Sequence, residues 1–119
     1  MQGFKSRIST FLIAACLFLA IGVTAQTPAI RIMPLGDSIT YGSPVAGGYR
    51  LPLYIALTNA GYNVDYVGSQ NGNSATGLGA EVNHEGHGGW KISDPSIGLY
   101  ENIYGWFETI EDPHVVLVH

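Results

Sequence analysis

The chain alternates short apolar runs with stretches of helical spacing. Residues 30–35 are mostly apolar, which is typical of a short buried β-strand. Residues 64–67 have the same character. Residues 114–119 begin a third such run, which is almost wholly apolar, as in a parallel sheet covered on both faces. The pattern therefore predicts three strands.

The first stretch with helical spacing is residues 49–61. Its apolar residues recur on one helix face, and Gly61 is a natural stop. Pro52 is tolerated there because it falls in the first turn. Residues 69–89 follow the second strand and are rich in Gly, Asn and Ser with no apolar period, so they predict a long loop of the kind that often carries function.

The second helix is expected within residues 93–109. Ser93 or Asp94 would cap it, and Pro95 would occupy its first turn. Its apolar side chains share one helix face, which we expect to pack in the core. These are Ile97, Tyr100, Ile103, Tyr104 and Phe107.

The order strand, helix, strand, loop, helix, strand predicts an α/β fold. We expect a three-layer α/β/α sandwich with a parallel sheet and right-handed crossovers. A parallel sheet of three strands would have two bare edges and little helical cover. We therefore expect residues 26–119 to be the N-terminal part of a larger domain, truncated after the third strand.

Residues 1–25 have the pattern of a secretory signal peptide. Lys5 and Arg7 precede an apolar run at residues 11–23, and small residues lead up to Ala25, where cleavage is expected. An uncleaved membrane anchor is the alternative, but a span needs about 20 apolar residues. We therefore expect a secreted, extracellular protein with no membrane association after cleavage.

The charged residues limit which classes of partner we expect for the chain after cleavage. Nine carboxylates and only three of the five Lys and Arg residues of the 119-residue chain follow position 25. An acidic surface with no basic cluster argues against nucleic acid and anionic membranes as partners. It is compatible with a neutral substrate.

The first candidate for chemistry is Ser38. It belongs to the run Gly-Asp-Ser-Ile-Thr-Tyr-Gly at residues 36–42, directly after the first strand. Gly36 permits a sharp turn, and Ser38 would then lie just past the carboxyl end of the strand, where open α/β sheets bind their ligands. Gly-Asp-Ser is also ordinary turn chemistry, which is the alternative interpretation.

The second candidate is the run His-Glu-Gly-His-Gly-Gly-Trp-Lys-Ile at residues 84–92. Consecutive glycines let backbone N–H groups approach a ligand closely, although they also suit a merely flexible loop. His84 and His87 invite a metal interpretation. Two histidines without a third clustered ligand do not make a zinc site, so we do not expect one.

Taken together, the motifs resemble those of the SGNH (GDSL) hydrolases. The likeness rests on residues 30–42, then Gly-Gly-Tyr-Arg, Val-Asp-Tyr-Val-Gly-Ser, Glu-Gly-His-Gly-Gly-Trp and Val-Val-Leu-Val-His in that order. Within that superfamily the chain looks most like carbohydrate esterase family three, the acetyl xylan esterase type. The resemblance implies that Ser38 is the nucleophile and also an oxyanion N–H donor. It assigns the second oxyanion N–H to Gly89, with Gly88 as the alternative, and implies no metal or organic cofactor.

Three further residues are candidates for contact with substrate. They are Asp37, Trp90 and Arg50. For Asp37 a hydrogen-bonding role within the loop is an alternative. Arg50 has a second interpretation, in which it ties down the start of the first helix.

The family's remaining motifs do not occur in this sequence. The block Gly-x-Asn-Asp, which supplies an oxyanion asparagine, and the late Asp-x-x-His, which supplies the base and its acid partner, are both absent. No family pattern makes a base of His84 or His87, and His119 is expected to border the site. We therefore expect the 119-residue chain by itself to be inactive or nearly so.

The expected function is a secreted serine esterase. It would remove O-acetyl groups from a plant cell-wall polysaccharide such as xylan through an acyl-serine intermediate. Two alternatives stay open: a lipase-like or thioesterase-like SGNH hydrolase, and a non-catalytic secreted module that binds carbohydrate through Trp90 and the tyrosines.

Overall fold

The computed structural model describes residues 26–119. The predicted signal peptide lies outside these residues. Their elements, in chain order, are β1 (Ile30–Gly36), α1 (Ser38–Tyr41), α2 (Arg50–Asn59), β2 (Val64–Tyr66), the short 3₁₀ turn η1 (Thr76–Leu78), β3 (Glu85–Gly86), α3 (Leu99–Thr109) and β4 (Val115–Val118).

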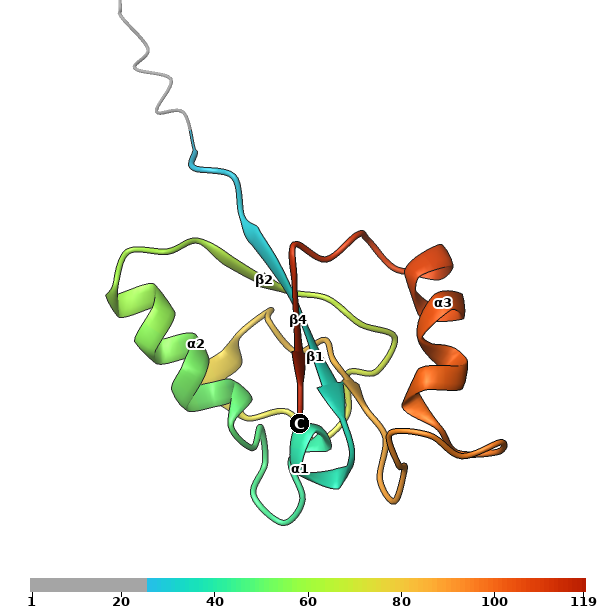
Figure 1. Ribbon diagram of the computed structural model, residues 1–119. Coiled ribbons are helices and arrows are strands. Elements are labelled where there is room, and N and C mark those ends of the chain that lie inside the picture. Colours follow the sequence, from blue (N-terminus) through green and yellow to red (C-terminus); the bar gives the residue numbers. More distant parts are fainter. Residues whose placement is uncertain (1–25) are drawn as a thin grey trace, which may run out of the picture.

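The sheet is parallel and is built around β1 (Figure 1). β4 pairs with the middle of β1, with Ile32 opposite Val115 and Leu35 opposite Val118. β2 and β3 both pair with residues of β1 that β4 also contacts, so they share the other edge of β1. β2 follows the start of β1, and the two-residue β3 follows its end.

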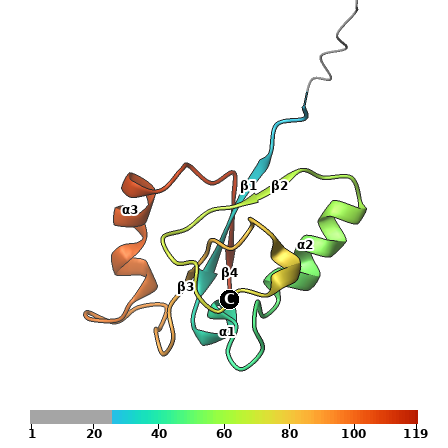
Figure 2. The same ribbon diagram turned by 180° about the vertical axis from the view of Figure 1, so that it is seen from behind.

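Helices cover both faces of this sheet, and Figures 1 and 2 show α2 and α3 on its opposite sides. Ile32 faces α2, in a cluster with Val64, Tyr66 and Leu78. The neighbouring residue Met33 faces α3, because successive side chains of a strand point to opposite faces. The predicted three-layer α/β/α fold is therefore confirmed.

Three short elements were not predicted, one of them the 3₁₀ turn η1 within the expected loop at residues 69–89. α1 is a single helical turn within the expected Ser38 loop, and β3 lies within the expected loop at residues 69–89. A strand of two residues has no measurable alternation, so only pairing with Leu35 and Gly36 of β1 reveals β3. Its position brings the end of the long loop against the carboxyl end of β1.

The second long helix begins later than predicted. Oδ1 of Asp94 accepts hydrogen bonds from the N–H groups of Ser96 (3.1 Å) and Ile97 (3.3 Å), which makes a local turn instead of a helix cap. These bonds, with that of Lys91, hold the pKa of the Asp94 carboxyl well below its usual range. Gly98, still extended, directly precedes α3. The prediction of a start at residues 93–95 was therefore wrong.

The apolar stripe of this helix was also placed partly wrong. Tyr100 is 63% exposed and Tyr104 is 69% exposed. The face that packs on the sheet is turned toward Leu99 and Ile103 instead. Spacing alone does not distinguish two adjacent faces of a strongly apolar helix, so it assigns both tyrosines to the core. The packed set also contains Trp106, Phe107 and Ile110.

Candidate active site

Ser38 lies at the carboxyl end of β1. Asp37 caps α1, since its Oδ1 accepts a hydrogen bond from the N–H of Ile39 at 2.9 Å. Ser38 is thus the first residue of α1 and is half-buried. Gly36 is needed before it, because a Cβ there would collide with the carbonyl oxygen of His119 and the hydroxyl of Thr40. Glycine is therefore required at position 36, because the backbone of His119 and the side chain of Thr40 leave no room for a Cβ.

The second glycine-rich stretch forms a turn from His87 to Trp90. The N–H of Trp90 donates to the carbonyl oxygen of His87 at 3.2 Å, which closes the turn. Gly89 has φ +80°, the value of the third residue of a type II turn, where glycine is favoured. We call residues 87–90 the glycine turn.

The glycine turn lies beside Ser38. The N–H of His87 donates to the carbonyl oxygen of Gly36 at 2.8 Å, so the turn starts directly at the end of β1. A Cβ placed on Gly88 would lie 4.0 Å from the Cβ of Ser38. Two motifs about 50 residues apart in the sequence are thus neighbours at one end of the sheet.

Backbone donors are available around this serine. Among residues 26–119, the N–H groups of Ser38, Gly88 and Gly89 donate no hydrogen bond to the protein. The hydroxyl of Ser38 likewise forms no side-chain hydrogen bond within this part of the chain. Free N–H groups beside a hydroxyl are the donors needed to hold the oxyanion that forms when that hydroxyl attacks an ester carbonyl.

The histidines of the described segment are engaged elsewhere. The Nδ1 of His84 accepts from the N–H of Gly86 at 3.0 Å, and its Nε2 lies 3.0 Å from the carbonyl oxygen of Gly72. Burial lowers the pKa of His84 to about 4, so its ring is neutral near pH 7. The ring of His119 stacks on Tyr49, with centroids 5.7 Å apart. Within residues 26–119, none of the histidines forms a hydrogen bond with Ser38.

Arg50 is a structural residue, and the prediction that it contacts substrate was wrong. Its side chain is completely buried. Its guanidinium donates to the carbonyl oxygens of Thr40 (3.0 Å), Tyr41 (3.1 Å) and Val82 (3.0 Å), and more weakly to that of Asn73 (3.4 Å). Burial also lowers the pKa of Arg50. A guanidinium enclosed by carbonyl groups holds loops together and offers no surface to substrate.

The other two candidates for substrate contact also have structural partners. Asp37 caps α1, as its alternative role predicted. Trp90 is half-buried and stacks on His87, with ring centroids 4.4 Å apart. Contact of either residue with substrate stays a prediction. The described residues contain no group of three or more His, Cys, Asp and Glu side chains placed to hold a metal ion. None of their helices is long and apolar enough to cross a membrane.

Sequence reasoning missed the residues that support the glycine turn. Glu85 is completely buried and Trp106 reaches the turn from α3. Composition alone indicates only a surface charge for Glu85, although its place between two histidines and before a glycine is visible in the sequence. Trp106 carried no signal, because only the packing of α3 brings it to the turn.

Comparison with known proteins agrees with this geometry. No family model matches the chain. A multidomain esterase of Ruminococcus flavefaciens is 40% identical over 96 residues, which is 75% of this chain. The structure of a family 3 carbohydrate esterase of Clostridium thermocellum is 43% identical over 76% of this chain, with a TM-score of 0.66. The predicted resemblance to the family 3 carbohydrate esterases is therefore confirmed.

The chain spans only part of each relative. It covers 12% of the Ruminococcus flavefaciens protein and 43% of the Clostridium thermocellum chain. These relatives support the assignment of this chain to the ester hydrolases. The reaction, the substrate and the roles of individual residues in this chain belong to the proposal that follows.

Proposed function

We propose that this chain carries the nucleophile and part of the oxyanion hole of a carbohydrate esterase. The observation that carries the proposal is the position of the glycine turn, at which a Cβ on Gly88 would approach the Cβ of Ser38 to 4.0 Å. The N–H groups of Ser38, Gly88 and Gly89 are free of acceptors within the described residues. The two relatives, both esterases, support the same reaction class.

The chemistry proceeds through an acyl-serine. Oγ of Ser38 attacks the ester carbonyl carbon while a base takes its proton, because a serine hydroxyl is a weak nucleophile without one. The carbonyl oxygen becomes an oxyanion, which the free N–H groups hold. The C–O bond to the alcohol then breaks, the alcohol oxygen takes the proton, and water attacks the acyl-serine to release the acid. The family resemblance implies that the base comes from outside residues 26–119.

The proposed substrate is an O-acetyl ester on a plant cell-wall polysaccharide such as xylan. One solved relative is a carbohydrate esterase, and the chain has few basic groups to attract an anionic substrate. The predicted signal peptide supports action outside the cell. A small acyl group suits a serine placed this close to a backbone turn.

We test this function in a chimera. Residues 26–119 replace the matching segment of the Clostridium thermocellum enzyme, so that the partner segment supplies the remaining motifs. We expect the chimera to release acetate from acetylated xylan and to cleave p-nitrophenyl acetate much faster than the butyrate and octanoate esters. The parent enzyme is the positive control.

Each other outcome identifies a different function. Faster cleavage of octanoate than acetate would replace the proposal with a lipase-like activity. Retention on acetylated xylan without acetate release, by a chimera with a cooperative unfolding transition, would replace it with a carbohydrate-binding module.

Replacing Gly89 by alanine tests the oxyanion role of the glycine turn. At φ +80° an L-residue is strained, and relief by a type I turn would flip the peptide that carries the N–H of residue 89. Loss of one oxyanion donor costs about 10²–10³ in rate. We therefore expect Gly89→Ala to lower kcat of the chimera on p-nitrophenyl acetate by about that factor.

Gly61→Ala is the matched control. Gly61 has φ +87°, and neither glycine has an atom within 4 Å of the site of a new Cβ. Both substitutions should therefore lower the free energy of unfolding by a similar amount, about 1–2 kcal/mol. Only Gly89→Ala should lower kcat, and equal kcat values for the two variants would remove Gly89 from the oxyanion hole.

A further inference from the structure

Beside the proposed esterase site lies a fully buried glutamate, Glu85, and glutamate is rarely buried in proteins. It lies in β3, and its side chain is completely buried. A buried carboxylate requires hydrogen-bond donors, since it has lost its water. Its Oε1 accepts the N–H of Ser69, and its Oε2 lies 2.7 Å from Nε2 of His87. The carboxylate is therefore held by contacts with residues near both ends of the long loop, Ser69 and His87.

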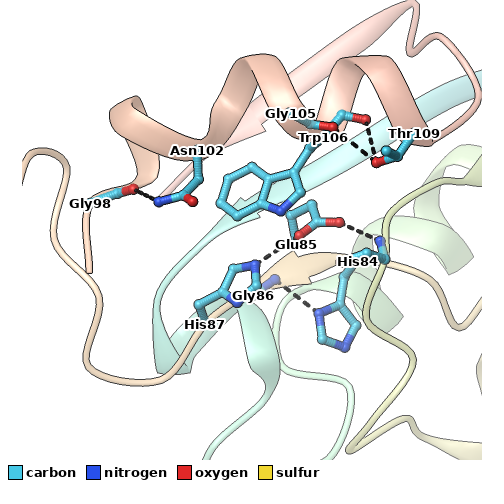
Figure 3. A network of polar contacts seen from close by, with 10 residues as sticks. His84, Glu85, Gly86, His87, Gly98, Asn102, Gly105, Trp106 and Thr109 are labelled. Carbon is cyan, nitrogen blue, oxygen red and sulfur yellow. Dashed lines mark hydrogen bonds and ion pairs between the residues drawn. The ribbon is translucent and has the colours of Figure 1, made fainter. Parts of the chain in front are cut away.

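The ring of His87 also contacts two neighbouring indoles, those of Trp90 and Trp106, whose centroids are 5.9 Å apart. Its imidazole stacks on Trp90, with centroids 4.4 Å apart and planes at 26°. It also stacks on Trp106 of α3, with ring centroids 4.8 Å apart and ring planes at 9° to each other (Figure 3). The imidazole of His87 therefore contacts two indole rings and, through its Nε2, a buried carboxylate.

His87 is also the first residue of the glycine turn. Its N–H bonds to Gly36 at the end of β1, and its carbonyl oxygen accepts the N–H of Trp90. A rotation about its backbone would thus disturb the ring contacts, the carboxylate contact and the turn at once. The residues between these two backbone bonds are Gly88 and Gly89.

We propose that His87 is a positioning residue for the oxyanion hole, and that Glu85 and the two indoles lock it so that the glycine turn presents its N–H groups to Ser38. This inference rests on the proposed function. It deepens that function by assigning a task to a buried Glu–His pair that takes no part in the acyl transfer. We assign His87 no role as the base, because within residues 26–119 neither of its ring nitrogens forms a hydrogen bond with Ser38, and Nε2 is engaged with Glu85.

The first experiment reads the turn directly in the 119-residue chain. In ¹H–¹⁵N spectra, His87→Phe should shift the amide resonances of Gly88 and Gly89 and leave that of Gly61 in place. His114→Phe is the matched control, because His114 pairs with Arg31 near the start of β1, away from the glycine turn. Unmoved Gly88 and Gly89 resonances in His87→Phe would overturn the proposal.

The second experiment measures catalysis in the chimera. A misplaced donor affects the transition state more than the bound ester, so His87→Phe should lower kcat on p-nitrophenyl acetate about 10- to 100-fold with little change in KM. His87→Gln should restore much of this loss, because its amide N–H can reach Glu85 from the same number of bonds. An unchanged kcat in His87→Phe would overturn the positioning role. A kcat in His87→Gln as low as in His87→Phe would overturn the role of the Glu85 contact.

The two arms separate this inference from the function on which it rests. If the wild-type chimera has no esterase activity, the proposed function fails, and the amide spectra alone decide whether His87 holds the turn. If the chimera is active and His87→Phe moves the amides without lowering kcat, the function stands and the positioning role falls. Thermal unfolding of each variant in both proteins shows whether the assay temperature lies below its transition.

Discussion

Ser38→Ala should abolish nearly all esterase activity of the chimera. Loss of the nucleophile of a serine hydrolase lowers kcat by about 10⁴- to 10⁶-fold. The fold should be unaffected, because Ser38 is only half-buried and its hydroxyl has no hydrogen-bond partner within residues 26–119. We therefore expect the free energy of unfolding to stay within about 0.5 kcal/mol of the wild-type value. Initial rates on p-nitrophenyl acetate and urea unfolding measure the two quantities.

Ser43→Ala is the control for this experiment. Ser43 follows α1 in the same loop and is exposed, and only its backbone contacts Ser38. Its replacement should leave kcat at the wild-type value. Activity retained in Ser38→Ala would show that another group attacks the ester.

Arg50→Met should cause the largest loss of stability among these substitutions. Methionine fills much of the same volume but cannot donate hydrogen bonds, so the carbonyl groups of Thr40, Tyr41 and Val82 would lose their partner. Each buried polar group left unsatisfied costs about 1–3 kcal/mol. We expect the free energy of unfolding of the 119-residue chain to fall by about 3 kcal/mol or more in urea.

Arg31→Met is the matched control. Arg31 is partly exposed and contacts Glu111 at 3.4 Å and the carbonyl oxygen of Asp112 at 2.6 Å. Surface ion pairs contribute about 0–1 kcal/mol, so its loss should be small. If the two variants are equally stable, the buried guanidinium does not hold the loops together.

Arg50 also illustrates why the site residues were only partly predictable. The sequence shows a cation near the start of a helix, which is compatible with a surface role, a capping role or a substrate contact. Burial depends on which loops cover the residue. Those loops include Asn73 and Val82, which are far from Arg50 in the sequence. For that reason the sequence predicts a substrate contact for Arg50, whereas the structure shows a buried guanidinium that hydrogen-bonds to several loops.

The sequence by itself determined the fold class, the position of the first strand and the esterase resemblance. These depend on local information: the apolar runs, the glycine and serine after residues 30–35, and the motifs in order. The same local information placed Ser38 at a strand end, because a strand followed by a small polar loop is visible within about ten residues.

Only the tertiary structure decided what surrounds that serine. β3 pairs with the end of β1, and this pairing brings the glycine turn to Ser38. The packing of α3 brings Trp106 onto His87, and the same packing exposes Tyr100 and Tyr104. A two-residue strand and the rotation of an apolar helix leave no mark in local spacing, since both are settled by contacts between distant segments.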